Sequence, residues 1–209
     1  GRVKLIFQPG EEGMRGAYPM VEAGMLDDVD YLLGLHIGLK ANQTGTLISG
    51  SYGFLATSKL DAVFKGVSSH AGLAPEEGKN ALLAAANAVI NLHSIPRHSE
   101  GASRVNVGMI QGGSGRNIVP DYAKIKLETR GINTKINQYM EHKARTILQS
   151  CADMFEVDLE IHPMGKAPSG TSDQELVSMI KSIGEEMADF SEIKEPMEFG
   201  ACEDVTFMM

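Results

Sequence analysis

The order of hydrophobic periods between residues 59 and 161 constrains the fold more than any other feature of the sequence. Four short segments alternate apolar with polar residues, which predicts half-buried strands at 59–65, 104–109, 123–128 and 157–161. Two longer segments repeat apolar residues every three or four positions, which predicts amphipathic helices at 80–93 and 136–154. The order strand, helix, strand, strand, helix, strand is typical of a split βαβ, or ferredoxin-like, α+β domain: one antiparallel sheet with two helices on one face.

The segments on either side predict parts of a second, α/β domain. Short apolar runs predict buried strands at 3–7 and 30–37. Helical patterns follow at 15–23 and 173–187, and residues 191–209 are rich in loops. We therefore expect an α/β domain in two parts, residues 1–56 and 166–209, interrupted by the ferredoxin-like domain at 57–165.

Composition excludes several classes of function. The net charge of −8 argues against a nucleic-acid partner, because phosphate binding needs clustered Lys and Arg. No apolar run approaches the ~20 residues that a membrane-spanning helix needs, so we expect no membrane association. Cys151 and Cys202 are the only cysteines and make no disulfide framework, which favours a cytoplasmic protein.

An adjacent pair of carboxylates is the strongest local signal for chemistry. Glu11 and Glu12 follow a predicted strand in a loop kept tight by proline and glycines at 8–13. Neighbouring side chains diverge, so one carboxylate can bind a metal while the other faces the substrate as general base. An exposed acidic turn is the simpler alternative. His36, at the end of the predicted strand 30–37, is either a hydrogen-bonded structural residue or a second metal ligand beside the carboxylate.

Two loops and one strand end of the ferredoxin-like unit carry further candidates. The small neighbours of His70 at 68–72 would let a partner or a substrate approach closely. The glycine-rich loop at 112–117 is typical of either a phosphate cradle or a hairpin connection, but Pro120 and a strand follow it instead of a helix, which weakens the phosphate interpretation. Arg130, at a strand end, suits either a carboxylate ligand or a surface cation.

Together these stretches resemble the metal-dependent exopeptidase and amidohydrolase family that includes carboxypeptidase G, aminoacylases, auxin-conjugate hydrolases and hippurate hydrolases. The resemblance lies in Gln-Pro-Gly-Glu-Glu-Gly at 8–13 and Gly-Leu-His at 34–36. It implies that Glu11 is the general base and that Glu12 and His36 are ligands of two divalent metal ions, Mn or Zn. It also implies the fold: a partial metallopeptidase-type α/β catalytic domain with an inserted ferredoxin-like lid and dimerisation domain.

The same resemblance assigns roles within the lid. His70 matches the histidine that reaches the substrate, commonly in the active site of the neighbouring protomer. Asn117 and Arg130 match positions that hold the carboxylate of the substrate. The implied partners are a small-molecule amide substrate and a second protomer, in a homodimer or a heterodimer through the lid domain.

Longer stretches narrow the expected function. The segments at 97–108, 115–120, 128–131 and 200–204 resemble the branch of the family that acts on aminobenzoyl-glutamate. This resemblance implies metal-dependent hydrolysis of an amide bond in aminobenzoyl-glutamate or a related N-acyl amino acid. A dipeptidase or aminoacylase of the same family, and a non-catalytic dimerisation or ligand-binding module, are the alternatives.

The chain also departs from the family pattern. The Cys-Gly-His-Asp-x-His segment upstream and a final ligand histidine downstream are not in the sequence, which opens inside an apparent strand and closes on Phe-Met-Met. We therefore expect a fragment with an incomplete metal site, inactive by itself. At a motif similar to Ser-Glu-Asp, Cys202 replaces the serine, and it is assigned no catalytic role.

Overall fold

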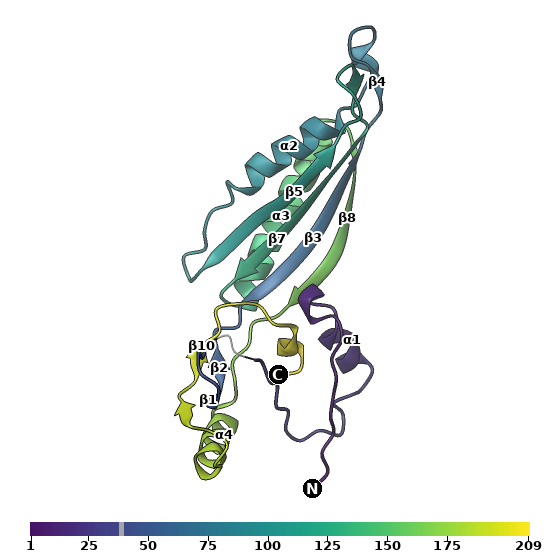
Figure 1. Ribbon diagram of the computed structural model, residues 1–209. Coiled ribbons are helices and arrows are strands. Elements are labelled where there is room, and N and C mark those ends of the chain that lie inside the picture. The colour runs from purple at the N-terminus through teal and green to yellow at the C-terminus, as the bar shows by residue number, and fades with distance from the viewer. Residues whose placement is uncertain (38–39) are drawn as a thin grey trace. The chain divides into compact units, whose positions relative to one another are not determined.

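The computed structural model describes residues 1–37 and 40–209, which form two compact units. Unit 2 is the continuous segment Thr57–Lys166. Unit 1 combines Gly1–Ala56 with Ala167–Met209, so unit 2 is inserted between the two parts of unit 1 (Figure 1).

Unit 2 is built on a four-stranded sheet with the order β5-β7-β3-β8. Its strands are β3 (Ala56–Lys65), β5 (Ser103–Gly112), β7 (Tyr122–Gly131) and β8 (Asp158–Ala167). The helices α2 (Ala81–Leu92) and α3 (Thr134–Met154) complete the order β3, α2, β5, β7, α3, β8 and lie on one side of the sheet (Figure 1). The predicted inserted ferredoxin-like domain is therefore confirmed.

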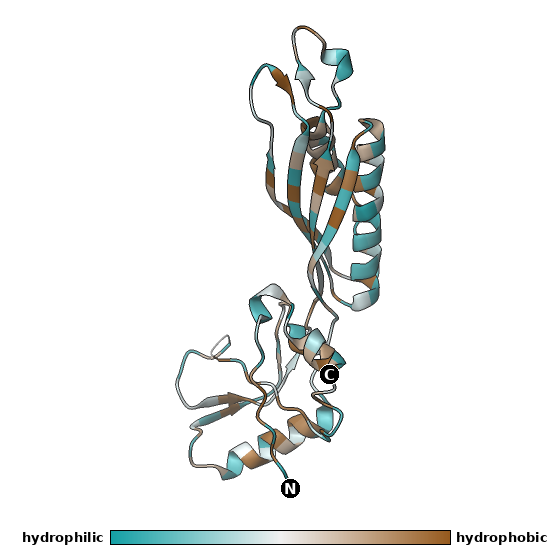
Figure 2. Cartoon of the chain, turned by 90° about the vertical axis from the view of Figure 1, so that its right-hand side faces the viewer, coloured by the Kyte–Doolittle hydropathy of each residue, from teal (hydrophilic) through white to brown (hydrophobic). Residues whose placement is uncertain are grey.

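The core of unit 2 lies between the sheet and its two helices. Its largest fully buried side chains are those of Leu60, Phe64, Leu92, Ile125, Met140 and Leu148. Small residues of α2, among them Ala81, Ala84 and Ala88, are fully buried and let the helix pack closely. Cys151 is buried in the same core, as its place on the apolar stripe predicts. Figure 2 shows that the outward surface of α3 is mostly hydrophilic, and none of the helices in the described ranges is long and apolar enough to cross a membrane.

The strand β3 differs from its prediction. Its alternation predicts one polar, exposed face, but Asp61 is only 6% exposed and Ser58 only 4%. Both side chains have polar partners, because Lys124 Nζ lies 2.6 Å from an Asp61 carboxylate oxygen and Ser58 donates a hydrogen bond to Glu141 at 2.7 Å. Alternation reports which residues are polar, whereas burial in an interior strand depends on what neighbouring strands place over it.

A small extension ends unit 2 beyond the main sheet. The short strands β4 (Ser69–His70) and β6 (Ile118–Val119) pair antiparallel, with His70 opposite Ile118. A 3-10 turn, η2 (Pro75–Glu77), follows β4. The glycine-rich loop thus connects β5 to β6 and β7, which are strands, and no helix N-terminus follows it.

Unit 1 contains short elements from both ends of the chain. The N-terminal part has the 3-10 turn η1 (Glu11–Gly13), the helix α1 (Ala17–Glu22) and the strands β1 (Thr46–Ile48) and β2 (Ser51–Tyr52). The C-terminal part has α4 (Gln174–Glu186), β9 (Glu192–Lys194), β10 (Met197–Glu198) and the 3-10 turn η3 (Asp204–Phe207). Parallel pairs β1–β9 and β2–β10 join the two parts.

Two strand predictions in unit 1 are wrong. Residues 3–7 and the described part of 30–37 are not strands, and their apolar side chains are exposed, with Val3 at 90% and Leu35 at 95%. A strand requires a neighbour for its backbone hydrogen bonds. No described strand lies beside either segment to provide one, so the apolar runs form extended coil.

Candidate active site

A tight turn presents the two adjacent carboxylates. Gly10 has a left-handed φ of 70°, which glycine adopts without steric cost, and its carbonyl accepts a hydrogen bond from Gly13 N–H at 3.1 Å. The resulting turn η1 leaves Glu11 half-buried and Glu12 exposed. The two side chains therefore lie in different environments, as the divergence of neighbouring residues predicts.

Asp204 fixes this turn from the other end of the chain. Its side chain is fully buried, and one carboxylate oxygen accepts hydrogen bonds from the backbone N–H groups of Gly16 and Ala17, both at 3.0 Å. The other oxygen accepts a hydrogen bond from Gln8 Nε2 at 2.5 Å. Gly16 leaves the space that this contact needs, since a Cβ atom there would lie 1.6 Å from the Pro9 carbonyl oxygen. Charge-assisted bonds of this kind are among the stronger hydrogen bonds in proteins.

Three carboxylates converge beside the turn. Among the described residues, Glu11, Glu203 and Asp204 offer ligand oxygens that lie within 4.8 Å of one another. Burial raises the pKa of Glu203 to about 8, together with a hydrogen bond to Glu11 and the negative charges of Glu11, Asp204 and Glu12. Crowded carboxylates repel one another unless they hold a proton or a cation, so the cluster is chemically suited to a divalent metal ion.

His36 lies next to this cluster. Its Nε2 atom is 3.9 Å from a Glu203 carboxylate oxygen. The imidazole also contacts the ring of Phe199 at a centroid distance of 5.8 Å, and Phe199 packs on Phe54 at 4.7 Å. The structure therefore brings together Glu11 and His36, which the sequence separates by 25 positions.

Glu203 and Asp204 were missed as site residues by the reading of the sequence. The signal was present, because they form an adjacent acidic pair of the same kind as Glu11 and Glu12. A pair near the far end of the sequence gives no indication by itself that it folds against the first pair. Cys202, next to them, is half-exposed and is not among the clustered ligands.

The candidate residues of unit 2 fall at two separate ends of the domain. His70 and Asn117 are neighbours, because Ala71 N–H donates to the Asn117 carbonyl at 3.0 Å and Gly72 N–H donates to His70 Nδ1 at 3.1 Å. Both side chains are exposed. Arg130 is at the opposite end of β7, about 26 Å from Tyr122 at ~3.3 Å per strand residue. One copy of unit 2 therefore does not bring Arg130 to His70 and Asn117.

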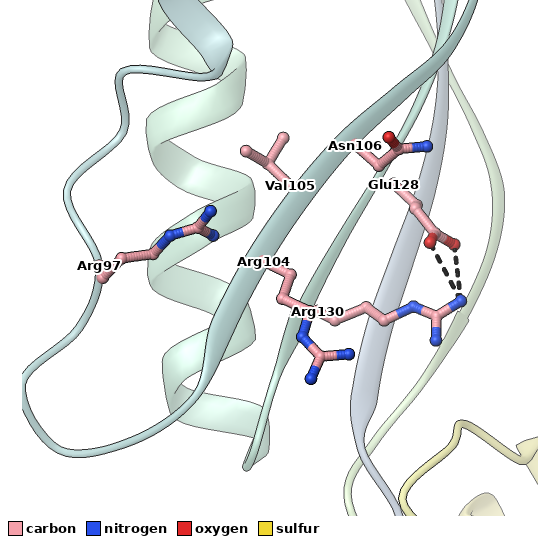
Figure 3. Close-up of a pocket in the computed structure, with 6 residues that line it drawn as sticks. All are labelled: Arg97, Arg104, Val105, Asn106, Glu128 and Arg130. Carbon is pink, nitrogen blue, oxygen red and sulfur yellow. Dashed lines mark hydrogen bonds and ion pairs between the residues drawn. The ribbon is translucent and has the colours of Figure 1, made fainter.

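Arg130 lies in a cavity of about 350 Å³ on unit 2. Its guanidinium group donates to the Glu128 carboxylate, with N–O distances of 3.0 and 3.2 Å (Figure 3). The lining residues are Arg97, Arg104, Val105, Asn106, Glu128 and Arg130.

Comparisons with known proteins identify the family. Residues 54–156 match the model of the M20 peptidase dimerisation domain. The chain is 49% identical over 210 residues to a p-aminobenzoyl-glutamate hydrolase of Escherichia coli strain K12, a match that covers 100% of this chain and 48% of that protein. The chain belongs to the M20 peptidase family. The predicted family and its fold are thus confirmed.

Other M20 relatives have related names. Indole-3-acetyl-aspartic acid hydrolase of Enterobacter agglomerans is 54% identical over 169 residues, covering 81% of this chain and 38% of that protein. A solved structure of the aminobenzoyl-glutamate utilization protein from Klebsiella pneumoniae is 44% identical with a TM-score of 0.90, covering 97% of this chain and 52% of that one. The chain therefore spans about half the length of the M20 relatives that it matches or less.

Proposed function

We propose that this chain carries the general base and part of the metal centre of an amidohydrolase that cleaves aminobenzoyl-glutamate or a related N-acyl amino acid. The convergence of Glu11, Glu203 and Asp204 beside His36, in a chain of the M20 family, is the observation that carries the proposal. The names of the two bacterial relatives above support the substrate class.

The donor set fits two divalent metal ions, Mn or Zn. Carboxylate oxygens and imidazole nitrogen are the ligands that these ions accept in proteins. A solved M20 relative from Bacillus subtilis is described as a dinuclear metal-binding peptidase, although at 19% identity it supports only the shared fold. In the proposal Glu12 and His36 hold metal, with Glu203 as an additional carboxylate within reach. A bound ion would lower the pKa of its water ligand to about 7.

The protein residues have separate tasks in this reaction. Glu11 accepts the proton of the attacking water and returns it to the nitrogen of the leaving amine. Asp204 keeps the Glu11 turn in place through the backbone N–H groups of Gly16 and Ala17, so the base does not need to reorganise during the reaction.

Unit 2 is the lid and dimerisation domain in this proposal. His70 would stabilise the oxyanion, and Asn117 and Arg130 would hold the substrate carboxylate. Because Arg130 lies about 26 Å along β7 from the end that carries His70 and Asn117, these groups can meet on one small substrate only if they come from different protomers. The separation supports a homodimer or a heterodimer joined through the domain that residues 54–156 match.

A peptide or a different N-acyl amino acid is the second candidate substrate. Hippurate hydrolase of Campylobacter jejuni and thermostable carboxypeptidase 2 of Saccharolobus solfataricus are 28% and 29% identical to the chain. Substrate profiling separates these possibilities, because the metal centre and Glu11 would be common to both.

The test compares Glu11→Gln with wild type in the full-length protein. We expect aminobenzoyl-glutamate cleavage with added Mn or Zn, and a loss of about 10²–10⁴ in rate for Glu11→Gln with metal content unchanged. Glu186→Gln, an exposed residue of α4, is the matched control and should retain full activity. Metal binding without cleavage of this substrate would refute the substrate class. Failure to bind metal would refute the proposal in favour of a dimerisation or ligand-binding module.

A further inference from the structure

Two arginines face each other across neighbouring strands of unit 2. Arg104 of β5 is the direct partner of Arg130 of β7 in the antiparallel register, and Asn106 is the partner of Glu128. Residues two positions apart on a strand point to the same face, so these four side chains share one face of the sheet. Like charges directly opposite each other destabilise a sheet. The pairing of two guanidinium groups therefore costs stability unless an anion lies between or beside them.

The cavity at this position is cationic in an acidic chain. Three guanidinium groups and one carboxylate among its lining residues give a local charge of +2, whereas the whole chain has −8. The groups differ in how far they are already engaged. Arg130 contacts Glu128, and Arg97 donates from Nη1 to the Ser103 carbonyl at 2.7 Å.

Arg104 is the least engaged of the three. Its side chain is exposed, and it makes no hydrogen bond or ion pair within the described ranges 1–37 and 40–209. Figure 3 shows the Arg130 guanidinium turned towards Glu128, whereas the Arg104 guanidinium points away from that carboxylate. Arg104 therefore retains its donors for a ligand, on the same cavity wall as Arg130.

We infer that this cavity binds a small dicarboxylate, with Arg104 and Arg97 on the second carboxylate. The inference rests on the proposed function, since it takes Arg130 as the group that binds the first carboxylate. Guanidinium groups bind carboxylates through two parallel hydrogen bonds, and Asn106 adds an amide donor. A ligand with two carboxylates neutralises the local charge of +2, which a ligand with one carboxylate does not. The substrate class is thus an amide of an acidic amino acid, and Arg104 determines the preference for it over a neutral amino acid.

The composition of the cavity argues against other anions. A nucleic-acid backbone needs an extended row of cations, and here Glu128 occupies the same face among the arginines. Inorganic phosphate also carries about two charges near neutral pH, but it is compact. A dicarboxylate places its two charges several carbon atoms apart, as the spread of Arg97, Arg104 and Arg130 around the cavity requires.

The test measures binding without catalysis. Glutarate, butyrate and inorganic phosphate are titrated into the full-length protein carrying Glu11→Gln, by calorimetry. We expect glutarate to bind at least ~10-fold more tightly than butyrate or phosphate, and Arg104→Met to weaken glutarate about 10- to 100-fold with little effect on butyrate, as for loss of a charged hydrogen bond. Arg104→Lys, which keeps the charge but not the fork, should lose affinity to a smaller extent. Arg116→Met is the control, because Arg116 is exposed and does not line the cavity.

Equal affinities for glutarate and butyrate, phosphate binding as tight as glutarate, or an unchanged Arg104→Met protein would each overturn the inference. A second measurement uses the protein with Glu11 intact and compares kcat/KM for N-acyl-glutamate and the isosteric N-acyl-glutamine. Arg104→Met should reduce the first value and not the second. If the protein binds glutarate through Arg104 but cleaves no amide, the dicarboxylate site stands and the proposed function fails.

Discussion

Replacing Asn137 with alanine should destabilise unit 2 strongly, although Asn137 is far in character from the hydrophobic core. Asn137 is 5% exposed, and its side-chain carbonyl accepts a hydrogen bond from the Thr129 hydroxyl at 2.9 Å. Its amide donates to the Ser58 hydroxyl at 2.9 Å, and Ser58 in turn donates to Glu141. Asn137 therefore links β3, β7 and α3 through one buried polar network.

The magnitude follows from what Asn137→Ala leaves behind. Thr129 is fully buried, so its hydroxyl loses its acceptor without access to water. An unsatisfied buried hydroxyl costs about 1–3 kcal/mol, and the lost bond to Ser58 adds about 1 kcal/mol. We therefore expect the free energy of unfolding of unit 2 to fall by about 2–4 kcal/mol, against a typical total of about 5–15 kcal/mol for a domain.

Native-state hydrogen exchange is the appropriate assay, because it reports on unit 2 separately from unit 1. The protection of the buried amides of β3 and β7 should fall about 30- to 700-fold. Gln138→Ala changes the next, exposed residue of α3 and should alter the free energy by less than about 0.5 kcal/mol. Adding Thr129→Val to Asn137→Ala removes the orphaned hydroxyl and should restore about 1 kcal/mol. If Asn137→Ala has no larger effect than Gln138→Ala, the reasoning about the buried network is wrong.

Two further changes test the network and the turn at the site. Burial acts to raise the pKa of Glu141, but hydrogen bonds from Ser58 and Arg145 outweigh it, so the pKa lies below its usual value of 4.5. The unfolded chain binds this proton more readily, so the carboxylate stabilises unit 2 above about pH 4.5, and this stability is lost as the pH falls through the lower folded pKa; Glu141→Gln should flatten the dependence of unfolding free energy on pH below about 5. Asp204→Asn should accelerate hydrogen exchange at Gly16 by at least ~10-fold and weaken metal binding, because an amide lacks the charge that holds two backbone N–H groups; unchanged exchange would show that Asp204 does not fix the turn.

The sequence determined the fold of unit 2 almost completely. Its helices and strands are long enough for the periods of 3.6 and 2 to appear clearly, and the domain buries them against one another in one continuous segment. Every element contacts partners that lie within the same stretch of sequence. Local pattern and tertiary packing therefore agree.

Unit 1 was predicted less well for the opposite reason. The apolar runs at 3–7 and 30–37 have the composition of buried strands, but strand formation depends on a neighbour to pair with, and the described chain places none beside them. The strands that do form in unit 1 are only two or three residues long and pair across more than a hundred positions of sequence. Such short pairs leave no readable period.

The site divides in the same way. The sequence indicated Glu11, Glu12 and His36, because the chemistry of their side chains and the loop that carries the acids are local properties. Only the tertiary structure placed Glu203 beside Glu11 and Asp204 under the turn, since contacts across almost 200 positions depend on how the chain folds. The facing of Arg104 and Arg130 is likewise a matter of strand register. A register is set by the packing of whole strands, and a shift of one residue would have moved both charges to the other face.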